Sequence, residues 1–155
     1  MAELLASRRA DIAAKDRIGQ QAMHLAAAWG HISLIESLAS LRSDIVAKAN
    51  DGSQPMHQAA FRGHGAVVEF LASRGLDISA ETSMGGEDGS QPMHLAALEG
   101  HRDVVKVLAS INSDIVAKTK SGKQPMDAAR HMGRDSVVEL ITQLMHAKKT
   151  RTPNK

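Results

Sequence analysis

Histidine is the residue of this 155-residue chain with the greatest capacity for chemistry, and the chain has eight of them. Imidazole binds metal ions and transfers protons near neutral pH. Six of the eight recur at two fixed places of a repeated phrase, and these six are His24, His31, His57, His64, His94 and His101. A metal site needs ligands at close local spacing, such as i and i+4, which this recurrence does not provide. We therefore predict structural histidines, with no metal site and no cofactor.

No catalytic arrangement stands out beside the histidines. The sequence contains no Ser-His-Asp order, no glycine-rich phosphate loop and no paired-carboxylate pattern that is separate from the repeated phrase. The aspartates Asp11, Asp44, Asp77 and Asp114 recur at one place of the phrase, so their pattern favours turn chemistry over catalysis. The sequence therefore predicts a protein that is not an enzyme, with no catalytic residues.

The repeated phrase also determines the architecture. It occurs as Met23-His24-Leu25-Ala26-Ala27, Met56-His57-Gln58-Ala59-Ala60, Met93-His94-Leu95-Ala96-Ala97 and Met126-Asp127-Ala128-Ala129. Successive copies begin 33, 37 and 33 residues apart, and each is followed by Gly-His or, in the last copy, Gly-Arg. A fixed period of this size is typical of a solenoid, in which each unit buries its apolar face only against its neighbours.

The phrase resembles the ankyrin repeat. The match is clearest in Gln54-Pro55-Met56-His57-Gln58-Ala59-Ala60 followed by Gly63-His64, and it extends over about residues 4 to 145. The resemblance implies an all-α ankyrin solenoid, built from antiparallel helix pairs with projecting β-hairpin fingers. It divides the chain into a half-repeat at 1–15, repeats at about 16–48, 49–81, 82–118 and 119–147, and a basic tail at 148–155 that we expect to be disordered.

The register of the repeats predicts the helices. We expect them at 22–29 and 32–41, 55–61 and 66–73, 92–99 and 102–111, and 125–132 and 135–146. The half-repeat supplies a second helix without a first, so it is either a minimal cap or the edge of a longer array. The polar residues Asp127, Arg130 and Arg134 of the last repeat indicate a cap at the other end.

Three departures from the regular pattern have structural consequences. Glutamine stands where the family has a helix-capping threonine, and its amide could reach the motif histidine instead. The third finger carries four extra residues, which lengthen the loop at 83–88. Arg42 and Asn112 stand where repeat two has Gly75, at a helix end that favours a left-handed residue.

Charge and composition limit the class of partner. The formal net charge is +2, and four basic residues after position 147 contribute +4, so residues 1–147 carry −2. A body of this charge argues against nucleic acid as the partner. The chain has no run of 18 apolar residues, no signal-peptide pattern and no cysteine, so we expect no membrane contact and a cytoplasmic or nuclear location.

The resemblance also places a binding face at the finger tips and the last turn of each inner helix. The predicted partner-binding residues are Arg17, Ile18, Gln20, Trp29, Asn50, Asp51, Phe61, Arg62, Glu87, Asp88, Leu98, Glu99, Lys120, Lys123 and Met132. Trp29 and Phe61 are two of the only three aromatic residues, which favours a role as interface anchors. The alternative is that these two side chains pack within the fold.

The functional prediction follows from this face. We expect a monomeric, non-catalytic module that binds a protein or a peptide in a concave groove. Two alternatives stay open: a targeting segment of a larger enzyme, such as a kinase or a ubiquitin ligase, and a small stand-alone inhibitor.

Overall fold

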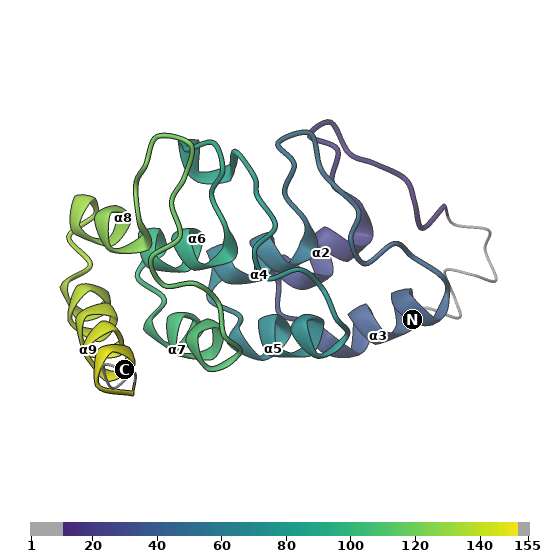
Figure 1. The fold of residues 1–155 in the computed structure, drawn as a ribbon. Helices are drawn as coiled ribbons and strands as arrows, with labels where there is room; N and C mark the ends of the chain where they lie inside the picture. Colours follow the sequence, from purple (N-terminus) through teal and green to yellow (C-terminus); the bar gives the residue numbers. More distant parts are fainter. Residues whose placement is uncertain (1–10, 152–155) are drawn as a thin grey trace.

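The helices form two stacked layers in a computed structural model that describes residues 11–151 (Figure 1). The inner layer contains α2 (Ala22–Ala28), α4 (Pro55–Arg62), α6 (Pro92–Glu99) and α8 (Pro125–His131). The outer layer contains α3 (Ile32–Ser40), α5 (Gly65–Ser73), α7 (Arg102–Ser110) and α9 (Asp135–Arg151). Each inner helix packs against the next inner helix, and α5, α7 and α9 pack in the same way. The predicted all-α solenoid is confirmed.

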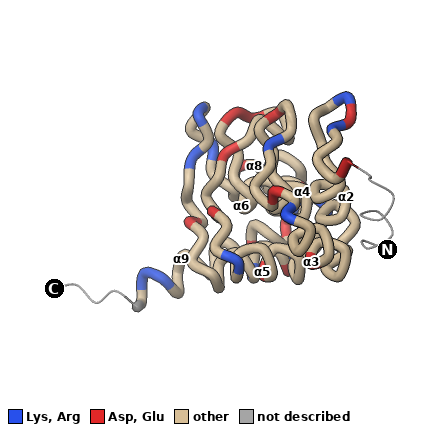
Figure 2. The backbone as a smooth tube through the Cα atoms, turned by 90° about the vertical axis from the view of Figure 1, so that its right-hand side faces the viewer, with Lys and Arg blue, Asp and Glu red and all other residues tan. Residues whose placement is uncertain are grey.

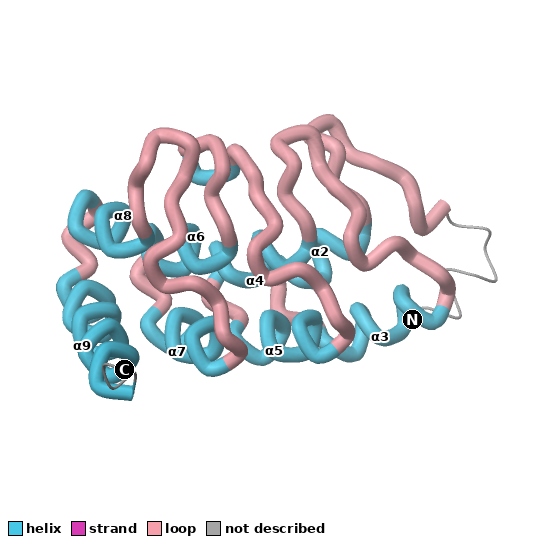
Figure 3. The backbone as a smooth tube through the Cα atoms, in the orientation of Figure 1, coloured by secondary structure: helices cyan, strands magenta, loops and turns pink. Residues whose placement is uncertain are grey.

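The fingers are loops rather than the β-hairpins that the resemblance implied, and Figure 3 shows them projecting from one side of the helices. Residues 11–151 contain no strand. Thr82 and Ser90 form an isolated antiparallel β-bridge in the third finger. In the second finger a backbone hydrogen bond from Ala49 N to Ser53 O, 2.9 Å long, closes the loop. Such short closures fix each finger without a strand ladder.

Neighbouring fingers are also bonded to one another. The backbone N–H of Asn50 donates to Ile18 O at 3.0 Å, and that of Ser83 donates to Asp51 O at 3.0 Å. The N–H of Lys120 donates to the carbonyl oxygen of Asp88 at 2.9 Å. The finger tips therefore form one continuous row.

The core consists of one apolar layer between the inner and outer helices. Met23, Met56 and Met93 occupy the same place in three repeats and are at most 1% exposed. The alanine pairs of the phrase are fully covered at Ala59-Ala60 and Ala96-Ala97, which allows close approach of neighbouring inner helices. The predicted inward-facing residues Val67, Val68 and Leu71 are buried.

The predicted helix bounds agree with the structure to within two residues, except at the end of α9. This helix continues through Arg151, so residues 148–151 are helical and do not belong to a disordered tail. The extension has a local cause, because residues 147–149 are good helix formers and the first breaker is Pro153. The predicted helix of the half-repeat and the last four residues of the predicted tail lie outside the described residues.

The amide nitrogens of Gln21 and Gln54 do not bond to the rings of the motif histidines. The Gln54 side chain instead donates from Nε2 to the carbonyl oxygen of Val46 in the preceding finger, at 3.3 Å. Gln21 makes the equivalent bond to Ala13 O at 3.2 Å. At these two positions glutamine therefore ties the preceding finger to the start of the helix, and the Gln54 side chain also takes part in a capping box with His57.

Arg42→Gly should raise the free energy of unfolding by about 1 kcal/mol, because Arg42 adopts a left-handed conformation with φ of 64° that costs a residue with a Cβ about this much. Asn112, with φ of 67°, tolerates this conformation better, so Asn112→Gly should have a smaller effect. Urea unfolding measures both changes. Gly75→Ala is the matched control: a Cβ there would meet no atom within 4 Å, so only its φ of 81° can make it destabilising. A loss of stability for Arg42→Gly would contradict the assignment of strain.

Candidate partner-binding face

The motif histidines join each inner helix to the following finger. Their Nδ1 atoms accept hydrogen bonds from the backbone N–H groups that begin the helices, as in Gln54 N to His57 Nδ1 at 3.1 Å. Their Nε2 atoms donate to finger carbonyl oxygens, because Nδ1 is the acceptor: His24 to Ser53 at 3.1 Å, and His57 to Ala80 at 2.8 Å. This pairing of both ring nitrogens confirms the predicted structural role and sets the angle between helix and finger.

The turn residues join each inner helix to the preceding one. His64 Nε2 lies 2.9 Å from the carbonyl oxygen of Ala28, and His101 Nε2 lies 2.9 Å from that of Phe61. In the last repeat, Arg134 Nε makes the equivalent bond to Leu98 O at 3.1 Å. The last turn of each inner helix, where the partner-binding residues are predicted, is therefore fixed by the next repeat.

Stability should fall as the pH drops below about 6.5, because burial lowers the pKa of the His24, His57 and His94 imidazoles in the fold. The unfolded chain then binds protons that the native chain does not, so the contribution is fully present above pH 6.5 and is lost on acidification. Urea unfolding from about pH 7.5 to pH 5 measures this slope.

The carboxylates affect a separate pH range. Hydrogen bonds from Ser79 lower the pKa of Asp77, and the Lys123 ammonium and Ser121 lower the pKa of Glu87. Protonation of these two carboxylates therefore changes the free energy of unfolding only below about pH 4.5. A flat profile between pH 7.5 and pH 5 would show that the histidines do not favour the neutral form in the fold.

The described residues contain no group of three or more His, Asp or Glu side chains that could hold a metal ion. Over the same range, no helix has both the length and the apolar character that spanning a membrane requires.

The predicted face combines the finger tips with two parallel rows on the inner helices. One row holds Trp29, Arg62, Glu99 and Met132, each the residue before the turn glycine. The other row, one position earlier, holds Ala28, Phe61, Leu98 and His131. We call the finger tips and these two rows the concave face. Trp29 and Phe61 occupy different rows, so they do not occupy equivalent places on neighbouring repeats.

The first row is the more exposed of the two. Trp29 is 70% exposed and Met132 44%, whereas Phe61 and Leu98 are half-buried. The Arg62 guanidinium lies 5.9 Å from the centroid of the Phe61 ring. Of the two predicted anchors, Trp29 therefore has its side chain accessible to a partner, whereas the Phe61 side chain packs partly within the fold.

Leu25 belongs to this face, although the sequence did not single it out. It is 45% exposed and lies one helical turn before Trp29 on α2, so the two side chains share one side of the helix. Ile18, at the tip of the first finger, is 58% exposed. Helical spacing from Trp29 was a signal that could have identified Leu25.

The charged residues of the finger tips are only partly free. Figure 2 shows acidic and basic segments at the tips of the fingers. The Lys123 ammonium contacts the Glu87 carboxylate, and Lys120 lies 3.9 Å from Asp88. These four residues, which we predicted to face a partner, pair with one another across two fingers. Arg17, Asn50 and Asp51 are exposed at the other tips, Gln20 is half-buried, and Glu99 is half-buried on α6.

Comparison with known proteins agrees with this architecture. A family model described as ankyrin repeats (3 copies) matches residues 1–82, and one described as ankyrin repeat matches residues 88–120. The chain therefore belongs to the ankyrin repeat family. Ankyrin repeats are generally protein–protein interaction modules and are typically non-catalytic. A comparison with curated proteins found no match.

Proposed function

We propose that this chain is a non-catalytic module that binds a protein or peptide partner on its concave face, with Trp29 as the main anchor. The observation that carries the proposal is the exposure of Trp29, one helical turn from the exposed Leu25, in the same repeat as the exposed finger residue Ile18. Exposed large apolar side chains that lie close together favour interaction, and tryptophan is enriched among interface hot spots.

The rigidity of the face supports the same function. The finger row and the turn residues hold the tips and helix ends by hydrogen bonds between repeats. A surface that is ordered before binding loses little conformational entropy when it associates. The face therefore suits recognition of a partner without rearrangement of the fold.

The free charges would orient the partner. Arg17, Arg62 and Glu99 have no salt bridge within residues 11–151, and they flank the apolar end of the face and its centre. Charges of this kind contribute to association rate and orientation more than to affinity.

Trp29 is the only tryptophan of the chain, so its fluorescence reports directly on the proposed anchor. We would select binders from a displayed library of 12-residue random peptides and titrate them into the full chain. Binding on the concave face should shift the emission to shorter wavelength, because the indole leaves water. Selected binders that leave the emission unchanged would contradict the proposal.

The control uses the opposite surface. Glu36 lies exposed on α3 in the outer layer, and Glu36→Gln should leave both the binding curve and the emission shift unchanged. If Glu36→Gln and a substitution of Trp29 reduced peptide affinity equally, the peptides would be adsorbing nonspecifically.

A further inference from the structure

The inserted loop at 83–88 folds back onto α6. It contains a short 3₁₀ turn, η1 (Met84–Gly86), and Gly85 within it has φ of 80°. A Cβ added to Gly85 would lie 3.0 Å from Leu95 Cδ2 and 3.2 Å from Leu98 Cδ2, so the backbone of the loop rests on these two leucines. Leu95 is 1% exposed, whereas Leu25 at the same place of repeat one is 45% exposed. The insertion therefore packs on α6 at the concave face of repeat three.

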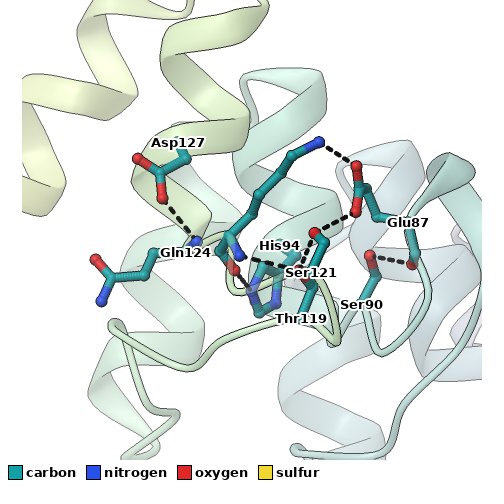
Figure 4. Close-up of polar contacts among 8 residues, drawn as sticks. Glu87, Ser90, His94, Thr119, Ser121, Gln124 and Asp127 are labelled. Atoms are coloured by element: carbon teal, nitrogen blue, oxygen red, sulfur yellow. Dashed lines mark hydrogen bonds and ion pairs between the residues drawn. The ribbon is translucent and has the colours of Figure 1, made fainter.

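The far side of the loop is tied to the fourth finger. The Glu87 carboxylate contacts the Lys123 ammonium and accepts a hydrogen bond from Ser121 Oγ at 2.7 Å (Figure 4). Within the loop, Ser90 Oγ donates to the Glu87 carbonyl oxygen at 2.8 Å. These contacts fix the inserted loop between α6 and the fourth finger.

A pocket of about 380 Å³ lies between the inserted loop and the inner helices. Its apolar lining comes from the glycines of η1, from Leu98 on α6 and from Ala128 on α8. Its polar lining is Glu87, Lys123, Asp127 and His131. The pocket has the size of a side-chain site, and the insertion forms one of its walls.

The polar lining is electrostatically unbalanced. Lys123 neutralises Glu87, but Asp127 has no salt bridge within residues 11–151. Asp127 Oδ2 accepts the Gln124 N–H at 2.8 Å, and Oδ1 has no donor among the described residues. In the earlier repeats the histidine at this place donates from its second ring nitrogen to the next finger, whereas residues 132–151 form the turn and α9 and supply no such finger. Asp127 therefore contributes to the pocket lining an exposed carboxylate with one oxygen that has no hydrogen bond within residues 11–151.

We propose that this pocket binds an arginine side chain of the partner. The aliphatic stem would lie on Leu98 and Ala128, because long basic side chains bury their methylene groups on apolar surface. The planar guanidinium would bond to Asp127, since it matches a carboxylate in shape and charge. The inference rests on the proposed function, because the arginine belongs to the partner, and it adds a specificity pocket at the end of the face opposite to Trp29.

The pocket can be tested without the partner, with n-butylguanidinium as the probe and 1-pentanol as its neutral counterpart. In amide-resolved NMR of the full chain, we expect saturable shifts at Gly85, Gly86, Ala128 and His131 with n-butylguanidinium, and much weaker ones with 1-pentanol. Asp127→Asn should weaken probe binding about fivefold or more, because asparagine can still accept the Gln124 N–H but lacks the charge. Equal binding of both probes would overturn the arginine assignment.

Two further variants complete the test. Asp103→Asn removes the same charge from the exposed start of α7 and should leave probe binding unchanged. Ala128→Leu fills the pocket without removing a polar group and should abolish the shifts, which keeps the test decisive if Asp127→Asn alters the fold. Unchanged affinity in both Asp127→Asn and Ala128→Leu would refute the site.

The peptide library separates this inference from the proposed function. Peptides selected on the native chain should be enriched in arginine relative to those selected on Asp127→Asn. If binders shift the Trp29 emission but show no arginine preference, the pocket proposal fails alone. If no binder affects Trp29, the anchor proposal fails, and the probe titration still decides the pocket.

Discussion

Trp29→Ala should lower the affinity for a partner on the concave face by about 30-fold or more, which corresponds to the roughly 2 kcal/mol of an interface hot spot. The same change should alter the free energy of unfolding by no more than about 0.5 kcal/mol, because truncating a 70% exposed side chain leaves no cavity. Binding titration with selected peptides and a circular dichroism melt measure the two effects separately.

The stability change of Trp29→Ala is compared with that of two residues whose side chains pack within the fold. Phe61→Ala should cost more stability than Trp29→Ala, because Phe61 is half-buried. Leu71→Ala, at a fully buried core position, should cost about 2–5 kcal/mol. If Trp29→Ala destabilised the fold as strongly as Leu71→Ala, Trp29 would be a packing residue and the proposed anchor would be lost.

His57→Asp should destabilise the fold by about 3 kcal/mol or more. His57 is fully buried, and its Nε2 bonds to the Ala80 carbonyl of the next finger at 2.8 Å. An aspartate could keep the bond to the helix start, as Asp127 does with Gln124, but it has no proton to donate to Ala80. The carbonyl would lose its partner and a charge would be buried beside it. Urea unfolding monitored by circular dichroism measures the loss.

The reverse exchange at the end of the array is the control. Asp127 is exposed, and among the described residues no finger follows α8, so Asp127→His should change the free energy of unfolding by less than about 1 kcal/mol. Similar losses for His57→Asp and Asp127→His would show that the bond to the next finger contributes little. The preference for histidine in the inner repeats would then need another cause.

The repeat period was enough to predict the helices, because each unit is local and every copy confirms the register of the others. The structural role of the histidines followed from their recurrence, and both ring nitrogens of His24 and His57 are indeed bonded. The left-handed conformation of Arg42 and Asn112 was likewise predictable from alignment with Gly75. These features depend on neighbours that the period itself specifies.

The candidate site was predictable only in part. The sequence predicted an exposed Trp29, and the side chain is exposed. It also predicted that Phe61 is an equivalent anchor. Phe61 lies one position earlier in its helix than Trp29 does, and one position turns a side chain by about 100° around the helix axis. It also offered Glu87, Asp88, Lys120 and Lys123 to a partner, while in the fold they pair with one another. Leu25 was not predicted, because the exposure of this place differs between repeats: Leu25 is 45% exposed, whereas Gln58 and Leu95 are 5% and 1% exposed.

By itself, then, the sequence determined the ankyrin solenoid, its helix register and the structural use of its histidines, since these depend on contacts repeated at a fixed spacing. Only the tertiary structure decided which side chains remain free. The inserted loop occurs once, so no periodicity shows that it folds onto Leu95 and Leu98 or that Glu87 meets Lys123. Exposure and pairing of this kind arise from contacts between segments that differ from repeat to repeat, and such contacts have no signature in the spacing of residues along the chain.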